Sequence, residues 1–92
     1  MSLDDFDVLV LRAMLRLARR RQAADDGEIA VRVSRPPSAV RGAVRRLGEL
    51  GLVERPPQAA PRLTMAGFAL AVALLPGAAR LSRPAQRAPR AA

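Results

Sequence analysis

Arginine supplies nearly all of the chemistry available to this chain. The sequence holds 16 arginines against eight acidic residues, which gives a formal net charge of +8, and it contains neither histidine nor cysteine. Their absence removes disulfides, zinc fingers and the commonest metal-binding and acid–base groups. No glycine-rich phosphate loop occurs, and no serine or aspartate stands beside a candidate base. We therefore expect no enzyme activity, no metal and no cofactor, and the sign of the charge favours a polyanionic partner.

Three arginines fall on the open side of a segment that is predicted to be a helix over residues 37–50. Its apolar stripe consists of Val40, Val44 and Leu47, which helical spacing places on one face. The opposite face carries Ser38, Ala39, Arg41, Gly42, Arg45, Arg46 and Glu49. A helix with one buried stripe and arginines on its other side suits the major groove of duplex DNA.

Each position on this open face has an expected role. Arg41 lies nearest the helix start and is the candidate for reading a base, whereas Arg45 and Arg46 are candidates for phosphate contacts. Ser38 and Ala39 are candidates for a phosphate contact and a thymine-methyl contact. The alternative for the arginines is a set of surface ion pairs with Glu49 and Glu54.

A shorter helix and a tight turn come before this segment and position it. Asp25 and Glu28 have the spacing of a capping box, so a helix is expected to start near Asp25. The turn runs from Ser34 to Pro37, because Pro36 excludes helical geometry from the residue before it and Pro37 suits the first turn of the next helix. Gly51 is expected to end the second helix with a positive φ. This layout is that of a helix-turn-helix.

Two short strands and a further helix are expected after the helix-turn-helix. Residues 53–55 and 62–64 have strand-like composition and flank a proline-rich loop. Arg55 and Arg62 border that loop, and contact with backbone phosphate and simple solvation are equally compatible with their positions. Thr64 is expected to cap a helix from residue 65 to about residue 75, which Pro76-Gly77 ends.

The first and last helices carry more apolar surface than one small domain covers. Residues 4–20 are predicted to form a helix with two apolar arcs, and residues 63–79 contain no charge. For the last helix the alternatives are a dimer contact with the first helix and a membrane segment between Arg62 and Arg80. The favoured reading is a two-fold dimer, with an interface made by Val8, Leu11, Leu15, Phe68, Val72 and Leu75.

The order of these pieces resembles a family pattern. Ile29-Ala30, Val33, Ser38-Ala39-Val40, Leu47 and Gly51-Leu52-Val53 are similar to the core of bacterial winged helix-turn-helix regulators of the multiple-antibiotic-resistance and arsenic-repressor types. Leu63-Thr64-Met65-Ala66-Gly67 matches the L-T-x-x-G with which the second wing strand of such proteins passes into the next helix. Three positions depart from the pattern: Arg35 is usually apolar, Gly42 is often a long polar residue, and the loop over residues 56–61 lacks the usual Asp-x-Arg.

The sequence therefore predicts a mainly α-helical protein with a small two-stranded wing, a winged helix-turn-helix over residues 1–77 and a basic, disordered tail over residues 78–92. We expect a homodimeric, sequence-specific binder of double-stranded DNA that acts as a transcriptional repressor in the cytoplasm, associated with the nucleoid. The DNA-contacting set is Ser38, Ala39, Arg41, Gly42, Arg45, Arg46, Arg55 and Arg62. The alternative is a winged-helix module for protein–protein interaction, which Arg35, Gly42 and the short loop favour.

Overall fold

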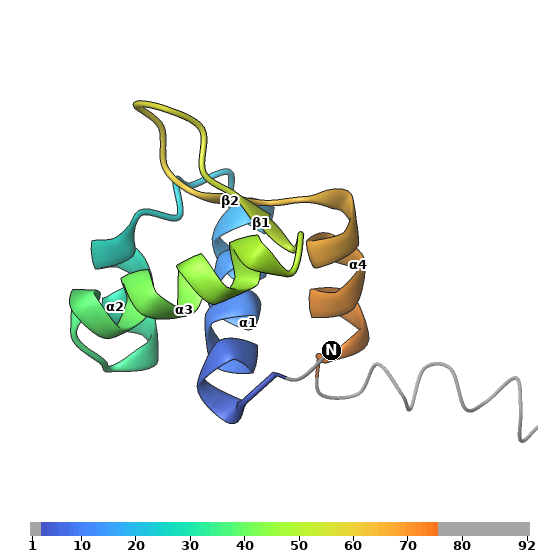
Figure 1. Ribbon diagram of the computed structural model, residues 1–92, viewed down its shortest axis with the longest axis horizontal. Coiled ribbons are helices and arrows are strands. Elements are labelled where there is room, and N and C mark those ends of the chain that lie inside the picture. The colour runs from blue at the N-terminus through green and yellow to red at the C-terminus, as the bar shows by residue number, and fades with distance from the viewer. Residues whose placement is uncertain (1–2, 76–92) are drawn as a thin grey trace, which may run out of the picture.

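Over residues 3–75, four helices surround a small hydrophobic core and carry a two-stranded antiparallel sheet at one edge (Figure 1). The structure is a computed structural model, which describes residues 3–75. Within that range the elements are α1 (Asp5–Arg19), α2 (Asp26–Val33), α3 (Pro37–Glu49), β1 (Val53–Glu54), β2 (Arg62–Leu63) and α4 (Met65–Ala73). This arrangement is compatible with a winged helix. The predicted tail, residues 78–92, lies outside the described residues.

The starts and ends of α2 and α3 follow from local sequence signals. The Asp25 side chain accepts a hydrogen bond of 2.8 Å from the backbone N–H of Glu28, which confirms the predicted cap. Ser34 ends α2 in the left-handed conformation, with φ 56°. Pro37 opens α3 at its first turn, and Gly51 follows the helix with φ 77°. The predicted helix–turn–helix geometry is thus present over residues 26–49.

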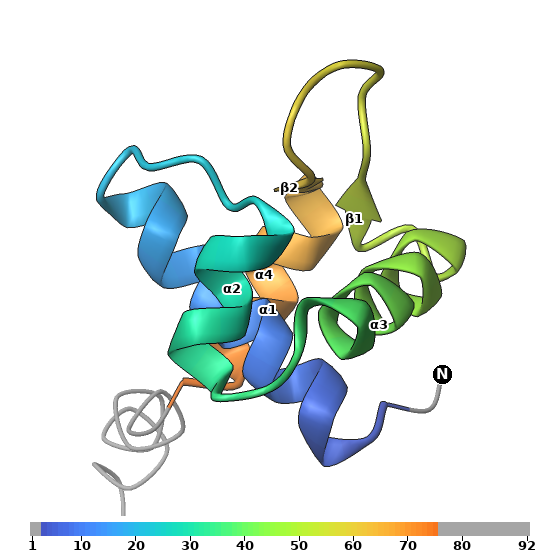
Figure 2. The same cartoon turned by 90° about the vertical axis from the view of Figure 1, so that its left-hand side faces the viewer.

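Helix α1 occupies the centre of the molecule and contacts α2, α3, α4 and β2 (Figure 2). Because neighbours cover it from several sides, most residues of both predicted apolar arcs lie inside the single chain. Leu11 and Leu15 are completely buried, so the prediction that they face a second subunit is wrong. Leu9, in contrast, is 41% exposed.

A small network at Thr64 joins the sheet to α4. The Thr64 N–H donates to the Leu52 carbonyl at 3.1 Å, and its hydroxyl donates to the Gly51 carbonyl at 2.7 Å. The same hydroxyl oxygen accepts from the N–H of Gly67 at 3.0 Å and so caps α4. A Cβ on Gly67 would lie 1.8 Å from the Leu52 carbonyl oxygen. A hydroxyl at position 64 and a glycine at position 67 are therefore both needed where the L-T-x-x-G sequence brings these backbones together.

Helix α4 is short and leaves apolar side chains on the surface. It contains nine residues and ends at Ala73, slightly before the predicted end near Leu75. No helix over residues 3–75 has the length and apolar character needed to cross a membrane. Met65 is 91% exposed and Phe68 is 44% exposed, whereas Val8, Val72 and Leu75 are half-buried. Four of the six residues predicted for a dimer interface thus retain some exposed surface.

Candidate nucleic-acid interface

The exposed side of α3 brings together five of the predicted contact residues. Val40, Val44 and Leu47 pack into the core, as predicted, and this fixes the rotation of the helix. Ser38, Arg41 and Arg45 consequently face solvent. Ala39 and Gly42 are half-buried on the same helix, so all five remain available from one side of the molecule.

A hollow of about 310 Å³ lies between α3 and β1. Its lining residues are Arg41, Val44, Arg45, Gly48, Val53 and Arg55. Two arginines of α3 therefore border the same concave surface as an arginine at the end of β1. In Figure 2 the loop between the two strands projects away from α3 and from the other helices.

Arg46 belongs to the same helix but is held by an acidic residue of α1. Its Nη2 donates to Asp7 Oδ1 at 2.8 Å, and its Nε donates to the same carboxylate at 3.3 Å. Asp7 is only 3% exposed, whereas the Arg46 side chain is 48% exposed. This ion pair neutralises a carboxylate that would otherwise be buried without a partner. The hydrogen bond to Asp7 also raises the pKa of Arg46.

The Asp7–Arg46 pair revises two sequence-based expectations. Arg46 was predicted as a phosphate contact, with Glu49 or Glu54 as the alternative partners, but its guanidinium is engaged by Asp7. Asp4 lies beside this pair, and the pKa of its carboxyl is lowered, first by hydrogen bonding with the Asp7 side chain and also by the charge of Arg46. The N-terminal end of α1 is therefore electrostatically tied to the second half of α3.

The arginines that flank the hairpin loop also have acidic partners. Arg55 Nη2 lies 3.0 Å from Asp26 Oδ1, which joins the end of β1 to the first turn of α2. Arg62 Nε donates to Glu54 Oε1 across the two strands, where these residues are register partners. Both pairs are solvent-exposed, and such pairs contribute only about 0–1 kcal/mol to stability. The sequence left contact with DNA and solvation open for Arg55 and Arg62, and neither alternative included these partners.

The arginines of this region thus fall into two groups. Over residues 3–75, Arg41 and Arg45 make no ion pair, and we call them the open arginines. Arg46, Arg55 and Arg62 each bind a carboxylate, and we call them the paired arginines. Among these five arginines, only the open arginines present guanidinium groups that no acidic side chain of the described chain already occupies.

Gly42 lies between the two groups on α3. A Cβ at this position would be 3.6 Å from Arg46 Nη1, an ordinary van der Waals distance. Space for a larger side chain therefore exists, but the residue offers no side chain to a ligand. The Gly42 position can contribute close approach of the backbone to DNA and no side-chain contact with a base.

Two further features were missed by reasoning from the sequence. The Arg35 guanidinium lies 5.3 Å from the centre of the Phe6 ring, so a cation–π contact covers the aromatic ring at this departure from the family pattern. Asp7 carried a usable signal, since it precedes Val10, Leu11 and Met14 by three, four and seven residues. That spacing places a carboxylate on a buried face of α1, where an arginine partner is expected.

No protein-family model matches the chain, and no curated protein sequence matches it. The resemblance to winged helix-turn-helix regulators consequently stays a prediction that depends on the residues quoted above.

Proposed function

We propose that this chain is a winged helix-turn-helix protein that binds double-stranded DNA and represses transcription. In this proposal α3 enters the major groove, and the β1–β2 hairpin is the wing. The observation that carries the proposal is the exposed side of α3, where Arg41 and Arg45 face solvent without an acidic partner in the described chain. Arginine in such a position forms bidentate hydrogen bonds with guanine or binds phosphate oxygens.

The roles of individual residues follow from their positions on α3. Arg41 is one helical turn closer to the start of α3 than Arg45, so it is assigned to a base edge and Arg45 to a phosphate. Ser38 is exposed near the helix start, where its hydroxyl suits a phosphate oxygen, and Ala39 suits a thymine methyl group. Arg46 receives no DNA contact in this proposal because Asp7 already binds it.

We further propose that the protein binds DNA as a two-fold dimer through α4. Met65 and Phe68 are exposed apolar side chains on a helix without charge, and Val72 continues the apolar surface toward its end. Large exposed apolar side chains grouped in this way are typical of interaction surfaces. A dimer with this interface would present two α3 helices to successive half-sites of a palindromic operator.

Fluorescence anisotropy tests the DNA-binding proposal directly. A labelled duplex from the region upstream of the protein's own gene is compared with a scrambled duplex of equal length at several salt concentrations. Tighter binding to the genomic duplex with a steep salt dependence supports a sequence-specific regulator. Equal and weak binding to both duplexes would contradict it for that operator region.

A second function is favoured by the paired arginines. Arg46, Arg55 and Arg62 were all candidates for DNA contact, yet each is bound to a carboxylate of the same chain. A winged-helix module that binds protein has no need of free phosphate-binding groups at these positions. Equal weak binding to the two duplexes, together with a stable complex with a protein other than this chain, would move the assignment to this class.

A further inference from the structure

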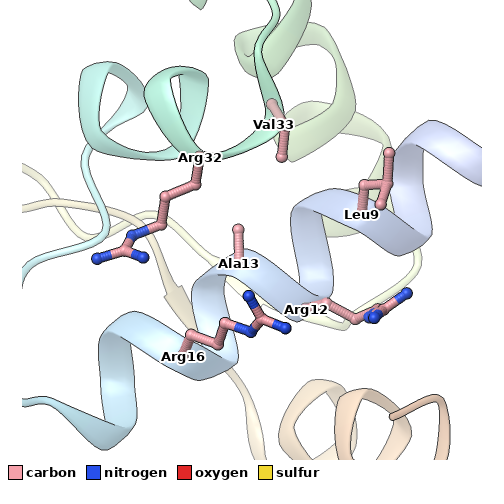
Figure 3. Close-up of a pocket in the computed structure, with 6 residues that line it drawn as sticks. All are labelled: Leu9, Arg12, Ala13, Arg16, Arg32 and Val33. Carbon is pink, nitrogen blue, oxygen red and sulfur yellow. The ribbon is translucent and has the colours of Figure 1, made fainter. Parts of the chain in front are cut away.

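A separate hollow of about 170 Å³ lies between α1 and α2, away from the proposed DNA surface (Figure 3). Its lining residues are Leu9, Arg12, Ala13, Arg16, Arg32 and Val33. Figure 3 shows Arg12 and Arg16 along one side of α1 and Arg32 projecting from α2 on the opposite border. The apolar side chains of Leu9, Ala13 and Val33 lie between the two helices in the same view.

This hollow lies on the side of α1 that faces away from α3. Asp7 binds Arg46 of α3, and Arg16 follows Asp7 by nine residues. At about 3.6 residues per turn, nine residues correspond to roughly two and a half turns, so the two side chains leave α1 in opposite directions. A ligand in this hollow therefore does not occupy the surface that is proposed for DNA.

The charge of the hollow is uncompensated. Three arginines line it, no acidic residue does, and none of the three arginines forms an ion pair within residues 3–75. Glu28 stands one turn before Arg32 on α2, but it is not within ion-pair distance of Arg32. Three like charges around one depression repel one another, and a ligand with two or more negative charges relieves that repulsion.

The chemistry of the lining defines the ligand further. Guanidinium groups bind phosphate through paired, charge-assisted hydrogen bonds, which a carboxylate with one charge cannot provide to three arginines at once. Leu9, Ala13 and Val33, which we call the apolar floor, favour a ligand with an apolar part, because burial of that part against them is favourable. A cavity of about 150 Å³ accepts a benzene ring, so a hollow of this size accepts one ring.

From these observations we propose that the α1–α2 hollow binds a small organic phosphate with a single-ring body. Arg12 and Arg16, which share one side of α1, bind the phosphate, Arg32 adds positive charge on the opposite border, and the ring lies over Leu9, Ala13 and Val33. The site is independent of the proposed DNA surface and does not require it.

Calorimetric titration with phenyl phosphate tests this site. Phenol and inorganic phosphate, which correspond to the two parts of phenyl phosphate, are the controls. The full chain is expected to bind one phenyl phosphate, at least about tenfold more tightly than inorganic phosphate or phenol, since only the whole molecule uses both the arginines and the apolar floor. Equal affinity for phenyl phosphate and inorganic phosphate would overturn the proposal, because it would mean attraction by charge alone. Absence of measurable binding would overturn it as well.

Three variants locate the binding. Arg12→Gln/Arg16→Gln is expected to weaken phenyl phosphate binding by about tenfold or more, and Leu9→Ser to weaken it while leaving inorganic phosphate unchanged. Both variants change residues with exposed or half-exposed side chains, and thermal unfolding verifies that they fold. Arg19→Gln removes one positive charge from the next turn of α1 outside the hollow, and it is expected to bind phenyl phosphate as the original chain does. An equal loss in Arg19→Gln would overturn the proposal.

Nucleic-acid backbone is the other possible source of phosphate. The Arg41→Gln/Arg45→Gln variant, which lacks the open arginines, is expected to bind phenyl phosphate normally. A random duplex should not displace the ligand from this variant. Displacement by the duplex would assign the hollow to a second DNA surface and would overturn a small-molecule site.

Discussion

The open arginines and the paired arginines carry the same charge within one region of the molecule, yet their surroundings differ. Arg41 and Arg45 face solvent without an acidic partner over residues 3–75, whereas Arg46 is bound by the buried carboxylate of Asp7. Arg55 is held by the partly buried Asp26 of α2, and Arg62 by the exposed Glu54 of β1. Position on an exposed face therefore does not make an arginine available for DNA, because acids elsewhere in the sequence decide which guanidinium groups remain free.

The largest predicted effect is a loss of stability when the Asp7–Arg46 ion pair is broken. Arg46→Ala should lower the free energy of unfolding by roughly 2–4 kcal/mol, because it leaves the carboxylate of Asp7 buried without a partner. Asp7→Ala should cost less, since the half-exposed Arg46 is then solvated. Urea unfolding of both single variants and the double variant measures the coupling. Equal stability of Arg46→Ala and the original chain would contradict the structural role of this arginine.

A smaller loss, in the free energy of DNA binding, is predicted when the open arginine Arg41 is replaced. Arg41→Ala should cost roughly 1–3 kcal/mol on the specific duplex and relax sequence preference, because a base contact is lost. Anisotropy with specific and scrambled duplexes measures both effects. Arg45→Ala is the matched control, and it should weaken the two duplexes alike. Equal losses on both duplexes for Arg41→Ala would remove its assignment to a base.

Removing the acidic partners of two paired arginines should strengthen DNA binding, whereas the loss of Arg41 should weaken it. Asp26→Asn/Glu54→Gln removes the acids that hold Arg55 and Arg62, so the freed groups should tighten binding to any duplex and increase the salt slope by about one to two. Glu49→Gln is the control, because it removes an exposed acid of α3 that makes no ion pair in the described chain. A salt slope that stays unchanged in the double variant would show that these arginines do not reach the DNA backbone.

The smallest predicted effect is the change in stability when the surface ion pairs of Arg55 and Arg62 are removed. Arg55→Ala and Arg62→Ala should each change the free energy of unfolding by no more than about 1 kcal/mol, since solvent screens both partners. Urea unfolding provides the measurement. A loss as large as that of Arg46→Ala would mean that the hairpin depends on these pairs, contrary to their exposure.

Features set by residues close in sequence were predictable. The cap at Asp25, the start of α3 at Pro37 and the positive φ of Gly51 each depend on one residue type within a turn. The stripe of Val40, Val44 and Leu47 likewise fixed the exposed side of α3. The candidate surface was therefore largely predictable on α3 itself.

Features that depend on distant parts of the chain were not predictable in this way. Leu11 and Leu15 have the spacing of a second apolar surface, and only the packing of several elements around α1 shows that both are core residues. Asp7 and Arg46 are 39 residues apart, so no local pattern joins them. Local spacing determines which face a residue occupies, whereas the fold determines what covers that face.

Salt dependence of duplex binding tests the central distinction between open and paired arginines most directly. Anisotropy at several salt concentrations gives the salt slope on one random duplex for the Arg41→Ala/Arg45→Ala and Arg55→Ala/Arg62→Ala variants. Loss of the open arginines should lower the salt slope by about one, because only Arg45 is assigned to a phosphate, and loss of both Arg55 and Arg62 should leave the slope unchanged. A larger fall in the Arg55→Ala/Arg62→Ala variant would contradict the distinction, because it would place the DNA on the hairpin arginines.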